Sequence, residues 1–226
     1  MLIPDVPPPI DPQAHPARST PETSPSPPVV IEPDRRIYKP ASWFERLDPV
    51  RMFGREAPLE VELGSGDGSF LVEWARRHPD RNFVGVERLL GRIRKLDRKS
   101  QRNRLSNVLG LRIEASYCLE YLLPPSSASA IHVYFPDPWP KRRHHKNRLV
   151  NERFPSLAHQ ALAPGAPIHL RTDNEEYFAQ MRAVFDACPG FRTTPTPEDL
   201  SGVTTDFERE FNASGIPTQR ASYTRV

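Results

Sequence analysis

From residue 58 onward, short apolar runs alternate with amphipathic stretches, a rhythm typical of repeated strand and helix units. The predicted strands are 59–63, 82–87, 108–114, 130–135, 168–172 and a last one at 219–226. Units of this kind assemble into a mostly parallel sheet with helices on both faces. We therefore predict an α/β, Rossmann-like fold.

Between the strands, apolar residues recur with the period of a helix. The predicted helices are roughly 69–77, 90–104, 116–122, 149–162 and 174–187. Pro155 lies inside the fourth helix, where a proline requires a late start or a kink. There is no internal repeat and no second core, so the pattern predicts one domain over residues 34–226.

The first 33 residues lack this periodicity. Twelve of the 27 prolines lie in residues 1–40, and Ser and Thr accompany them. Such a segment cannot bury enough apolar surface to offset the entropy of ordering, so we predict a disordered, Pro-rich tail at 1–33.

Composition excludes several classes of protein. The chain has no signal-peptide pattern at its start and no run near the roughly 18 apolar residues of a membrane span. Its two cysteines, Cys118 and Cys188, form no metal or redox motif. We expect a soluble, cytoplasmic protein, and the sequence does not distinguish a monomer from a homodimer.

The net charge is only +3, but the cations are unevenly placed. Residues 88–104 carry eight Lys or Arg against one acid, and residues 141–148 carry five more. On a helix, one stripe of the first segment would hold Arg88, Arg92, Lys95, Lys99 and Arg102. A basic stripe fits the phosphates of a polyanion, although a solvated amphipathic helix has the same pattern.

A glycine-rich loop, Gly64-Ser65-Gly66-Asp67-Gly68, joins the first strand to the first helix. Glycines there permit positive φ and a close approach of the backbone to a ligand. Glu87 ends the second strand, where an acid in this architecture accepts from ribose hydroxyls. The spacing G-x-G-x-G differs from the dinucleotide pattern G-x-G-x-x-G, and Glu62 suits ammonium and sulfonium charges. S-adenosylmethionine is therefore favoured over NAD.

Four acids follow or end successive predicted strands. They are Glu62, Glu87, Glu114 and Asp137. In an open α/β sheet, ligands lie outside the carboxyl ends of the strands, so these carboxylates are expected at one rim.

Asp137 belongs to the most informative segment, Phe135-Pro136-Asp137-Pro138-Trp139-Pro140-Lys141, which runs into a basic stretch ending at Arg148. The prolines fix φ and remove backbone donors, so the loop holds its carboxylate and indole in place. This combination suits chemistry on a nucleobase. By itself, a proline-rich surface turn with solvated charges is an equal alternative.

These residues resemble the bacterial tRNA (guanine-N7)-methyltransferases, a class I S-adenosylmethionine-dependent family. The similarity covers about residues 40–226. Its motifs are 62–68, 85–87, the Pro-Asp-Pro-Trp stretch with Arg143, His144 and Lys146, then Thr172-Asp173 and 205–208. The resemblance implies a mostly parallel seven-stranded sheet and methyl transfer from S-adenosylmethionine to guanine N7 at position 46, in the variable loop of tRNA.

The resemblance also implies roles for individual residues, with Asp137 as the catalytic residue. The implied cofactor contacts are Glu62, Gly64, Gly66, Gly68, Glu87, Glu114 and Asp137. The implied substrate contacts are Lys141, Asp173, Thr205, Asp206, Phe207 and Glu208. The implied RNA contacts are Arg143, His144, His145, Lys146, Asn147 and Arg148. Two departures from the family pattern stand out: Glu114 replaces the usual Asp beside adenine, and Asn147 replaces a cation.

Other interpretations remain open from the residues alone. An NAD(P)-dependent oxidoreductase conflicts with the loop spacing and the basic flank, and a non-catalytic RNA-binding module conflicts with four intact rim acids. A methyltransferase acting on an exocyclic amine of another nucleic acid is excluded only by the longer resemblance. His144 and His145 have no third ligand at a sensible spacing, so no metal is expected.

Overall fold

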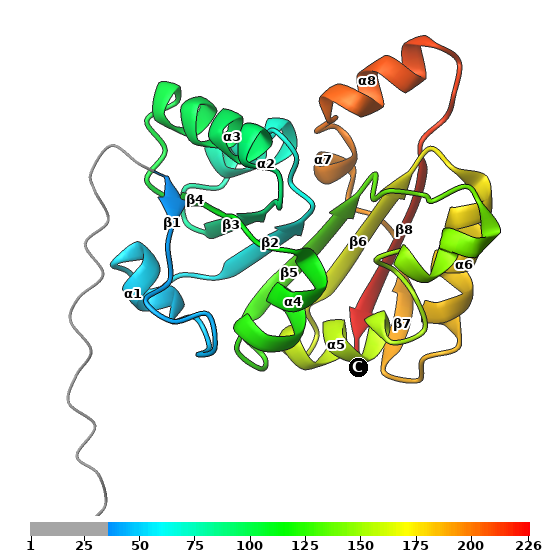
Figure 1. Ribbon diagram of the computed structural model, residues 1–226, viewed down its shortest axis with the longest axis horizontal. Coiled ribbons are helices and arrows are strands. Elements are labelled where there is room, and N and C mark those ends of the chain that lie inside the picture. The colour runs from blue at the N-terminus through cyan, green and yellow to red at the C-terminus, as the bar shows by residue number, and fades with distance from the viewer. Residues whose placement is uncertain (1–35) are drawn as a thin grey trace, which may run out of the picture.

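The computed structural model describes residues 36–226, so the predicted tail at 1–33 lies outside the described residues. Eight strands form one sheet in this part of the chain, in the order β1-β4-β3-β2-β5-β6-β8-β7 (Figure 1). The strands are β1 (Ile37–Tyr38), β2 (Leu59–Leu63), β3 (Asn82–Val86), β4 (Val108–Leu111), β5 (Ala128–Tyr134), β6 (Pro167–Thr172), β7 (Phe191–Thr194) and β8 (Gln219–Arg225).

The pairs among β1 to β6 are parallel, whereas β8 runs antiparallel between β6 and β7. This topology confirms the predicted Rossmann-like, mostly parallel fold. β2 to β8 give the seven strands that the resemblance implies, although the sequence pattern located only six of them and missed β7. The two-residue β1 extends the sheet beyond β4. The strand order reverses at β2, which has β3 on one side and β5 on the other. α/β sheets of this kind bind their ligands at such a reversal.

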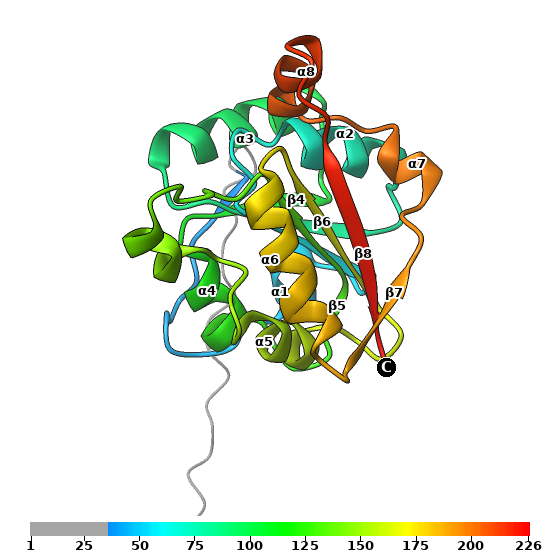
Figure 2. The same ribbon diagram turned by 90° about the vertical axis from the view of Figure 1, so that its right-hand side faces the viewer.

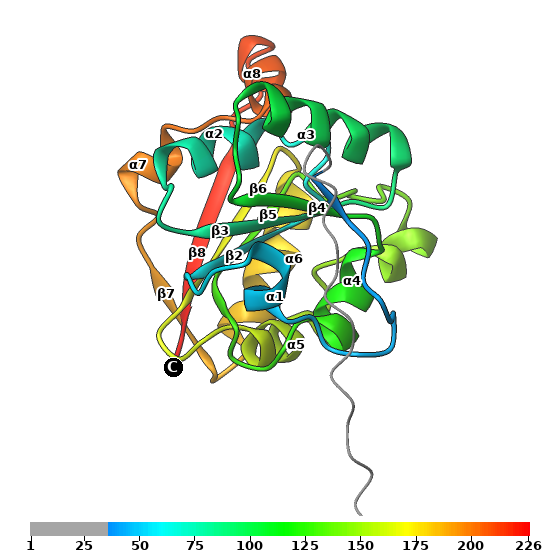
Figure 3. The same cartoon turned by 90° about the vertical axis from the view of Figure 1, so that its left-hand side faces the viewer.

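Helices cover both faces of the sheet, as Figures 2 and 3 show from opposite sides. One face carries α2 (Ser69–Arg77), α3 (Leu90–Arg102), α7 (Glu198–Ser201) and α8 (Asp206–Ala213). The other carries α1 (Pro49–Phe53), α4 (Ala115–Tyr117), α5 (Phe154–Ala161) and α6 (Glu175–Asp186). A π-helical turn, η1 (Cys118–Leu122), continues α4, and a 3₁₀ segment, η2 (Arg142–Asn147), precedes α5. None of the helices within residues 36–226 is long and apolar enough to cross a membrane.

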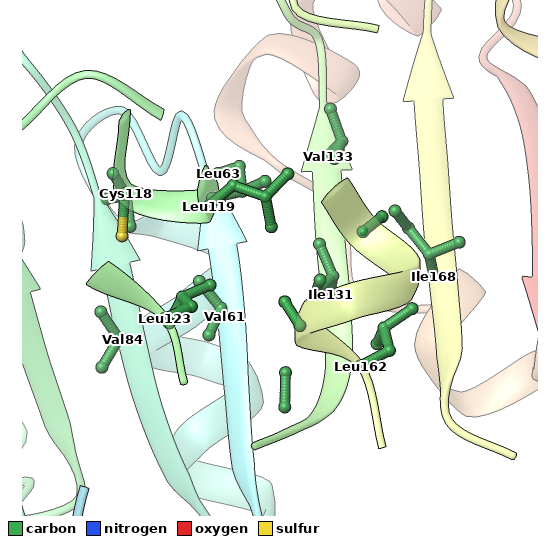
Figure 4. Packing of buried hydrophobic residues seen from close by; sticks show 14 of the residues in the cluster. Val61, Leu63, Val84, Cys118, Leu119, Leu123, Ile131, Val133, Leu162 and Ile168 are labelled. Carbon is green, nitrogen blue, oxygen red and sulfur yellow. The ribbon is translucent and has the colours of Figure 1, made fainter. Parts of the chain in front are cut away.

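The face under α1, α4, α5 and α6 is almost wholly apolar. Figure 4 shows Val61 and Leu63 of β2 packed near Leu119 and Leu123, while Ile168 of β6 lies near Leu162. Strands covered on both sides need apolar residues at most positions, and this is why the strand runs were readable in the sequence.

The opposite face contains a buried polar layer, because alternate residues of β2, β5 and β6 point to it. Glu60 accepts hydrogen bonds from Trp74 Nε1 at 2.8 Å, Arg81 Nη1 at 2.6 Å and His132 Nε2 at 2.8 Å. Burial alone would raise the pKa of Glu60, but these donors lower it to about 2. For His169, burial disfavours the charged form and lowers the pKa to about 3. The Glu60 carboxylate is therefore fully paired within this layer.

The predicted elements match well at the centre of the sheet and less well at its ends. α5 starts late, with Pro155 in its first turn, as predicted. Strand 108–114 ends early at Leu111, and helix 116–122 is split into α4 and the π turn. The elements β1, α1, β7, α7 and α8 were not predicted.

Candidate active site

A cavity of about 420 Å³ opens at the carboxyl ends of β2, β3, β4 and β5. The residues that follow these strands line it, together with the first turn of α3. They include Gly64, Glu87, Arg88, Arg92, Glu114, Asp137, Trp139 and Asn147. Three of the four predicted rim acids therefore lie on one cavity, and the fourth, Glu62, lies two residues before Gly64.

The glycine loop bends tightly between β2 and α2. Its three glycines all have positive φ, +83° at Gly64, +55° at Gly66 and +77° at Gly68. A Cβ at Gly64 or Gly66 would meet no protein atom within 4 Å, whereas one at Gly68 would lie 2.7 Å from Leu96 Cγ. Gly68 is therefore required for packing against α3, and the first two glycines leave open space beside the cavity.

Glu62 is the most unusual acid of the site. Its side chain is buried, and its Oε2 has no hydrogen-bond partner within the described residues. Burial raises the pKa of Glu62 well above its usual range, the Arg171 charge opposes this, and the Asp67 and Glu87 charges add to it. A buried, unpartnered carboxylate beside two further acids is an environment that favours a cationic ligand.

Glu87 fixes the loop around the cavity. Its Oε2 accepts from the Gly66 amide at 3.1 Å, and its Oε1 accepts from the Leu89 amide at 2.7 Å. The side chain thus ties the end of β3 to the glycine loop and to the start of α3. Glu114 behaves differently, because it is exposed and caps α4 by accepting from the Tyr117 amide at 2.9 Å.

The Pro-Asp-Pro-Trp loop forms the mouth of the cavity. Phe135 and Trp139 have φ of +49° and +46°, in the left-handed region that non-glycine residues avoid. Strain of this kind costs of order 1–3 kcal/mol per residue and clusters at functional sites. Between them, Asp137 is 70% exposed, and its Oδ2 lies 3.9 Å from Arg88 Nη2. The strained loop therefore presents a solvated carboxylate over the cavity.

The basic stretch after this loop forms the 3₁₀ segment η2. Lys141, Arg143, Lys146 and Asn147 are exposed, and His144 packs edge-on against Trp139 at 5.8 Å between ring centroids. His145 is half-buried, and its Nε2 lies 3.1 Å from Arg148 Nη2.

Arg148 was predicted to contact RNA, but its side chain lies inside the protein. Its side chain is 1% exposed and donates to the Pro138 carbonyl at 2.7 Å and to Gln180 Oε1 at 2.6 Å. The guanidinium also lies over the Tyr177 ring, 4.9 Å from its centroid. Arg148 therefore anchors the Pro-Asp-Pro-Trp loop to α6 and is not available to a phosphate.

Two of the predicted substrate contacts are also internal. Glu208 is fully buried and pairs with Arg171 at 3.0 Å and with Arg220, so it holds α8 to the sheet. Thr205 is buried and caps α8, its Oγ1 accepting from the Glu208 amide at 2.9 Å. Asp206 and Phe207 of the same segment are exposed.

The basic stripe of α3 also contains both a paired cation and exposed ones. Lys99 contacts two carboxylates, Asp67 Oδ2 at 2.8 Å and Asp206 Oδ2 at 3.4 Å, so it is not a free cation. Arg88, Arg92, Lys95 and Arg102 are exposed. Arg92 also lies over the Phe207 ring, 5.6 Å from its centroid.

Residues 56–221 match a protein family described as "Putative methyltransferase". The tRNA (guanine-N(7)-)-methyltransferase of Alkalilimnicola ehrlichii is 36% identical over 170 residues, which are 75% of this chain and 72% of that protein. The chain belongs to the tRNA (guanine-N7)-methyltransferase family.

Other relatives of this family are similar over shorter stretches. The enzyme of the same name from Chromohalobacter salexigens is 40% identical over 65% of this chain and 60% of its own length. That of Methylococcus capsulatus is 42% identical over 66% of this chain and 63% of its own length. The matched stretch thus spans about three fifths to three quarters of these relatives.

Solved structures agree on the fold. The 16S rRNA methyltransferase KamB superposes with a TM-score of 0.58 at 18% identity, covering 84% of this chain and 99% of that one. A 30S ribosomal A1408 methyltransferase from an uncultured bacterium gives 0.56, also at 18%, covering 80% and 96%. The tRNA (guanine-N7)-methyltransferase family is a class I methyltransferase family, and its cofactor is S-adenosylmethionine.

Proposed function

We propose that this protein transfers a methyl group from S-adenosylmethionine to N7 of guanine 46 in the variable loop of tRNA, in the cytoplasm. The observation that carries the proposal is the strained Pro-Asp-Pro-Trp loop, which holds Asp137 over a cavity bordered by the glycine loop. The names of the relatives support the same activity.

The residues around the cavity fit the cofactor. The unpartnered carboxylate of Glu62 suits the ammonium and sulfonium charges, and the open space at Gly64 and Gly66 admits a ligand against the backbone. Glu87 would accept from the ribose hydroxyls, and Glu114 lies on the cavity wall where the family pattern has its adenine contact. When bound, S-adenosylmethionine supplies the methyl group.

Guanine N7 has a lone pair and no proton, so its methylation requires no general base. The enzyme must instead align the base and balance the positive charge that the purine acquires. Asp137 is our candidate for this role, because it lines the cavity and its side chain is 70% exposed in the free protein.

Recognition of the base is assigned to the neighbouring side chains. Trp139 lines the cavity and can stack on guanine, a contact that contributes about 1–3 kcal/mol in single-strand binders. Asp173 follows β6 as Asp137 follows β5, and these parallel strands pair Tyr134 with Arg171. Both carboxylates therefore lie at one edge of the sheet, where Asp173 can accept from guanine N1 and N2. Lys141 and the exposed Phe207 complete the proposed substrate contacts.

The decisive experiment is methylation of an unmodified tRNA transcript with labelled S-adenosylmethionine, followed by nucleoside mapping. We expect N7-methylguanosine at one position of the variable loop. Label on an exocyclic amine would assign the alternative methyltransferase reaction. Binding of tRNA without any label would indicate a non-catalytic RNA-binding module.

Glu62→Gln is expected to stabilise the ligand-free protein while weakening cofactor binding. The pKa of Glu62 is raised in the folded state, so its cost to stability is absent below the unfolded pKa and appears as the pH rises above it. The thermal midpoint of the variant should therefore exceed that of the parent at pH 8 and equal it near pH 4. Affinity for S-adenosylhomocysteine should fall at least about tenfold, since a hydrogen bond to a charged group contributes about 1.5–3 kcal/mol. Calorimetry and thermal scans measure both effects, and equal midpoints at pH 8 would contradict this account.

Arg143→Gln with Lys146→Gln is expected to weaken tRNA binding and its salt dependence. Each lost phosphate contact lowers the slope of log K against log salt by about one, so the double variant should lose about two. Arg192→Gln, an exposed cation of β7 at the far edge of the sheet, is the matched control. Filter binding across a salt series gives the slopes, and an unchanged slope in the double variant would make these cations ordinary surface.

A further inference from the structure

Lys99 lies between two segments that serve different ligands in the proposed reaction. Its Nζ contacts Asp67 of the glycine loop at 2.8 Å and Asp206 at the start of α8 at 3.4 Å. A lysine that bridges acids on two separate elements holds those elements together.

Backbone contacts reinforce the same junction. The Asp206 amide donates to Ser69 Oγ at 3.2 Å, and the Ser69 amide donates to Asp67 Oδ1 at 3.2 Å. Partial burial alone would raise the pKa of Asp67, but the hydrogen bond and charge of Lys99 hold it below its usual range. The junction therefore contains an ionised acid that Lys99 stabilises.

Arg92 provides a second link, two turns earlier on α3. It lines the cavity, and its guanidinium lies 5.6 Å from the centroid of the exposed Phe207 ring on α8. Residues seven apart on a helix share one face. One face of α3 thus carries both cations: Arg92, which lies over the Phe207 ring, and Lys99, which contacts Asp206.

We propose that Lys99 is a positioning residue that couples occupancy of the cofactor cavity to tRNA binding at α8. This inference rests on the proposed function, which assigns Phe207 of α8 to the substrate side. A ligand seated against Gly64 and Gly66 reduces the conformational freedom of the glycine loop. Through Asp67 and Lys99 it then holds the start of α8 in place before tRNA arrives.

Coupling of this kind is reciprocal, so each ligand must raise the affinity of the other by the same factor. In the parent protein, saturating S-adenosylhomocysteine should tighten tRNA binding by about fivefold, at the lower end of common coupling energies. Lys99→Met should bring this factor close to one, and Lys99→Arg should restore most of it.

Lys95→Met is the matched control, because Lys95 lies one turn away on α3, is exposed, and has no acid partner among residues 36–226. It can lower tRNA affinity as a lost phosphate contact, but it should leave the coupling factor unchanged. Hydrogen exchange of residues 205–213 gives a second measurement. S-adenosylhomocysteine should slow exchange there in the parent and in Lys95→Met, but not in Lys99→Met.

The inference is overturned if the parent shows no coupling, or if Lys99→Met retains the parent factor. Failure of the proposed function looks different, since the parent would then bind no tRNA or leave its guanine unmethylated. A loss of α8 protection in Lys99→Met that is the same with and without ligand would assign Lys99 a purely structural role and would also overturn the inference.

Discussion

Asp137→Asn is expected to lower kcat by about 10²–10³-fold, the range seen when one preorganised electrostatic group is removed from a catalytic site. Asparagine keeps the shape of the side chain but has no charge to balance the cation on the methylated purine. Asp137 is 70% exposed, so water screens its charge in the free protein. The substitution should therefore leave the thermal midpoint unchanged and alter tRNA and S-adenosylhomocysteine affinities by no more than a few-fold.

Asp80→Asn provides a closely matched control. Asp80 is 73% exposed and lies 3.9 Å from Arg81, much as Asp137 lies 3.9 Å from Arg88, but it precedes β3 at the opposite edge of the sheet. Single-turnover methylation of a tRNA transcript should separate the two variants by the full catalytic factor. Near-parental turnover in Asp137→Asn would refute the catalytic assignment.

The central strands were predictable because both of their faces are covered. β2, β3 and β5 consist mostly of apolar residues bounded by turn signals, so their positions follow from the sequence. β7 and α8 have no comparable signal. β7 has four residues, only one of them buried, and its pairing with β8 places it in the sheet. Tertiary contacts decide such short elements, and one sequence does not contain them in readable form.

The candidate site was likewise predictable only in part. That Glu87, Glu114 and Asp137 face one cavity follows from the rule that parallel strands deliver their carboxyl ends to one edge. The sequence does not show which cations lack a partner within the protein, because such partners are distant in the chain. Arg148 is held by Gln180, 32 residues away, and Lys99 reaches Asp206, 107 residues away.

Arg171 carried a signal that could have been read. It lies two residues after His169 in β6, at a position that the alternation of the strand directs into the buried polar layer. An arginine at such a position requires a carboxylate partner. An internal acid was therefore to be expected somewhere in the chain, although the sequence does not identify Glu208 as that acid.

Glu208→Ala is expected to cause the largest loss of stability, about 3–5 kcal/mol, because it leaves a buried guanidinium without its counter-charge. Both Arg171 and Glu208 are almost fully buried, at 1% and 0% side-chain exposure. Arg171 would keep its hydrogen bonds to the carbonyls of Leu200 at 2.6 Å and Val203 at 2.7 Å, but these bonds do not neutralise it. For a chain of this size the thermal midpoint should fall by roughly 10 °C.

Glu210→Ala, an exposed acid two residues further along α8, is the control and should shift the midpoint little. Replacing both members of the buried pair, as Arg171→Met with Glu208→Leu, should recover part of the loss, because neither member is then left as a buried charge without its counter-charge. Urea unfolding of the three variants measures the difference. A free energy of unfolding for Glu208→Ala within about 1 kcal/mol of the control, the upper end of exposed ion pairs, would show that α8 is not held to the sheet by this pair.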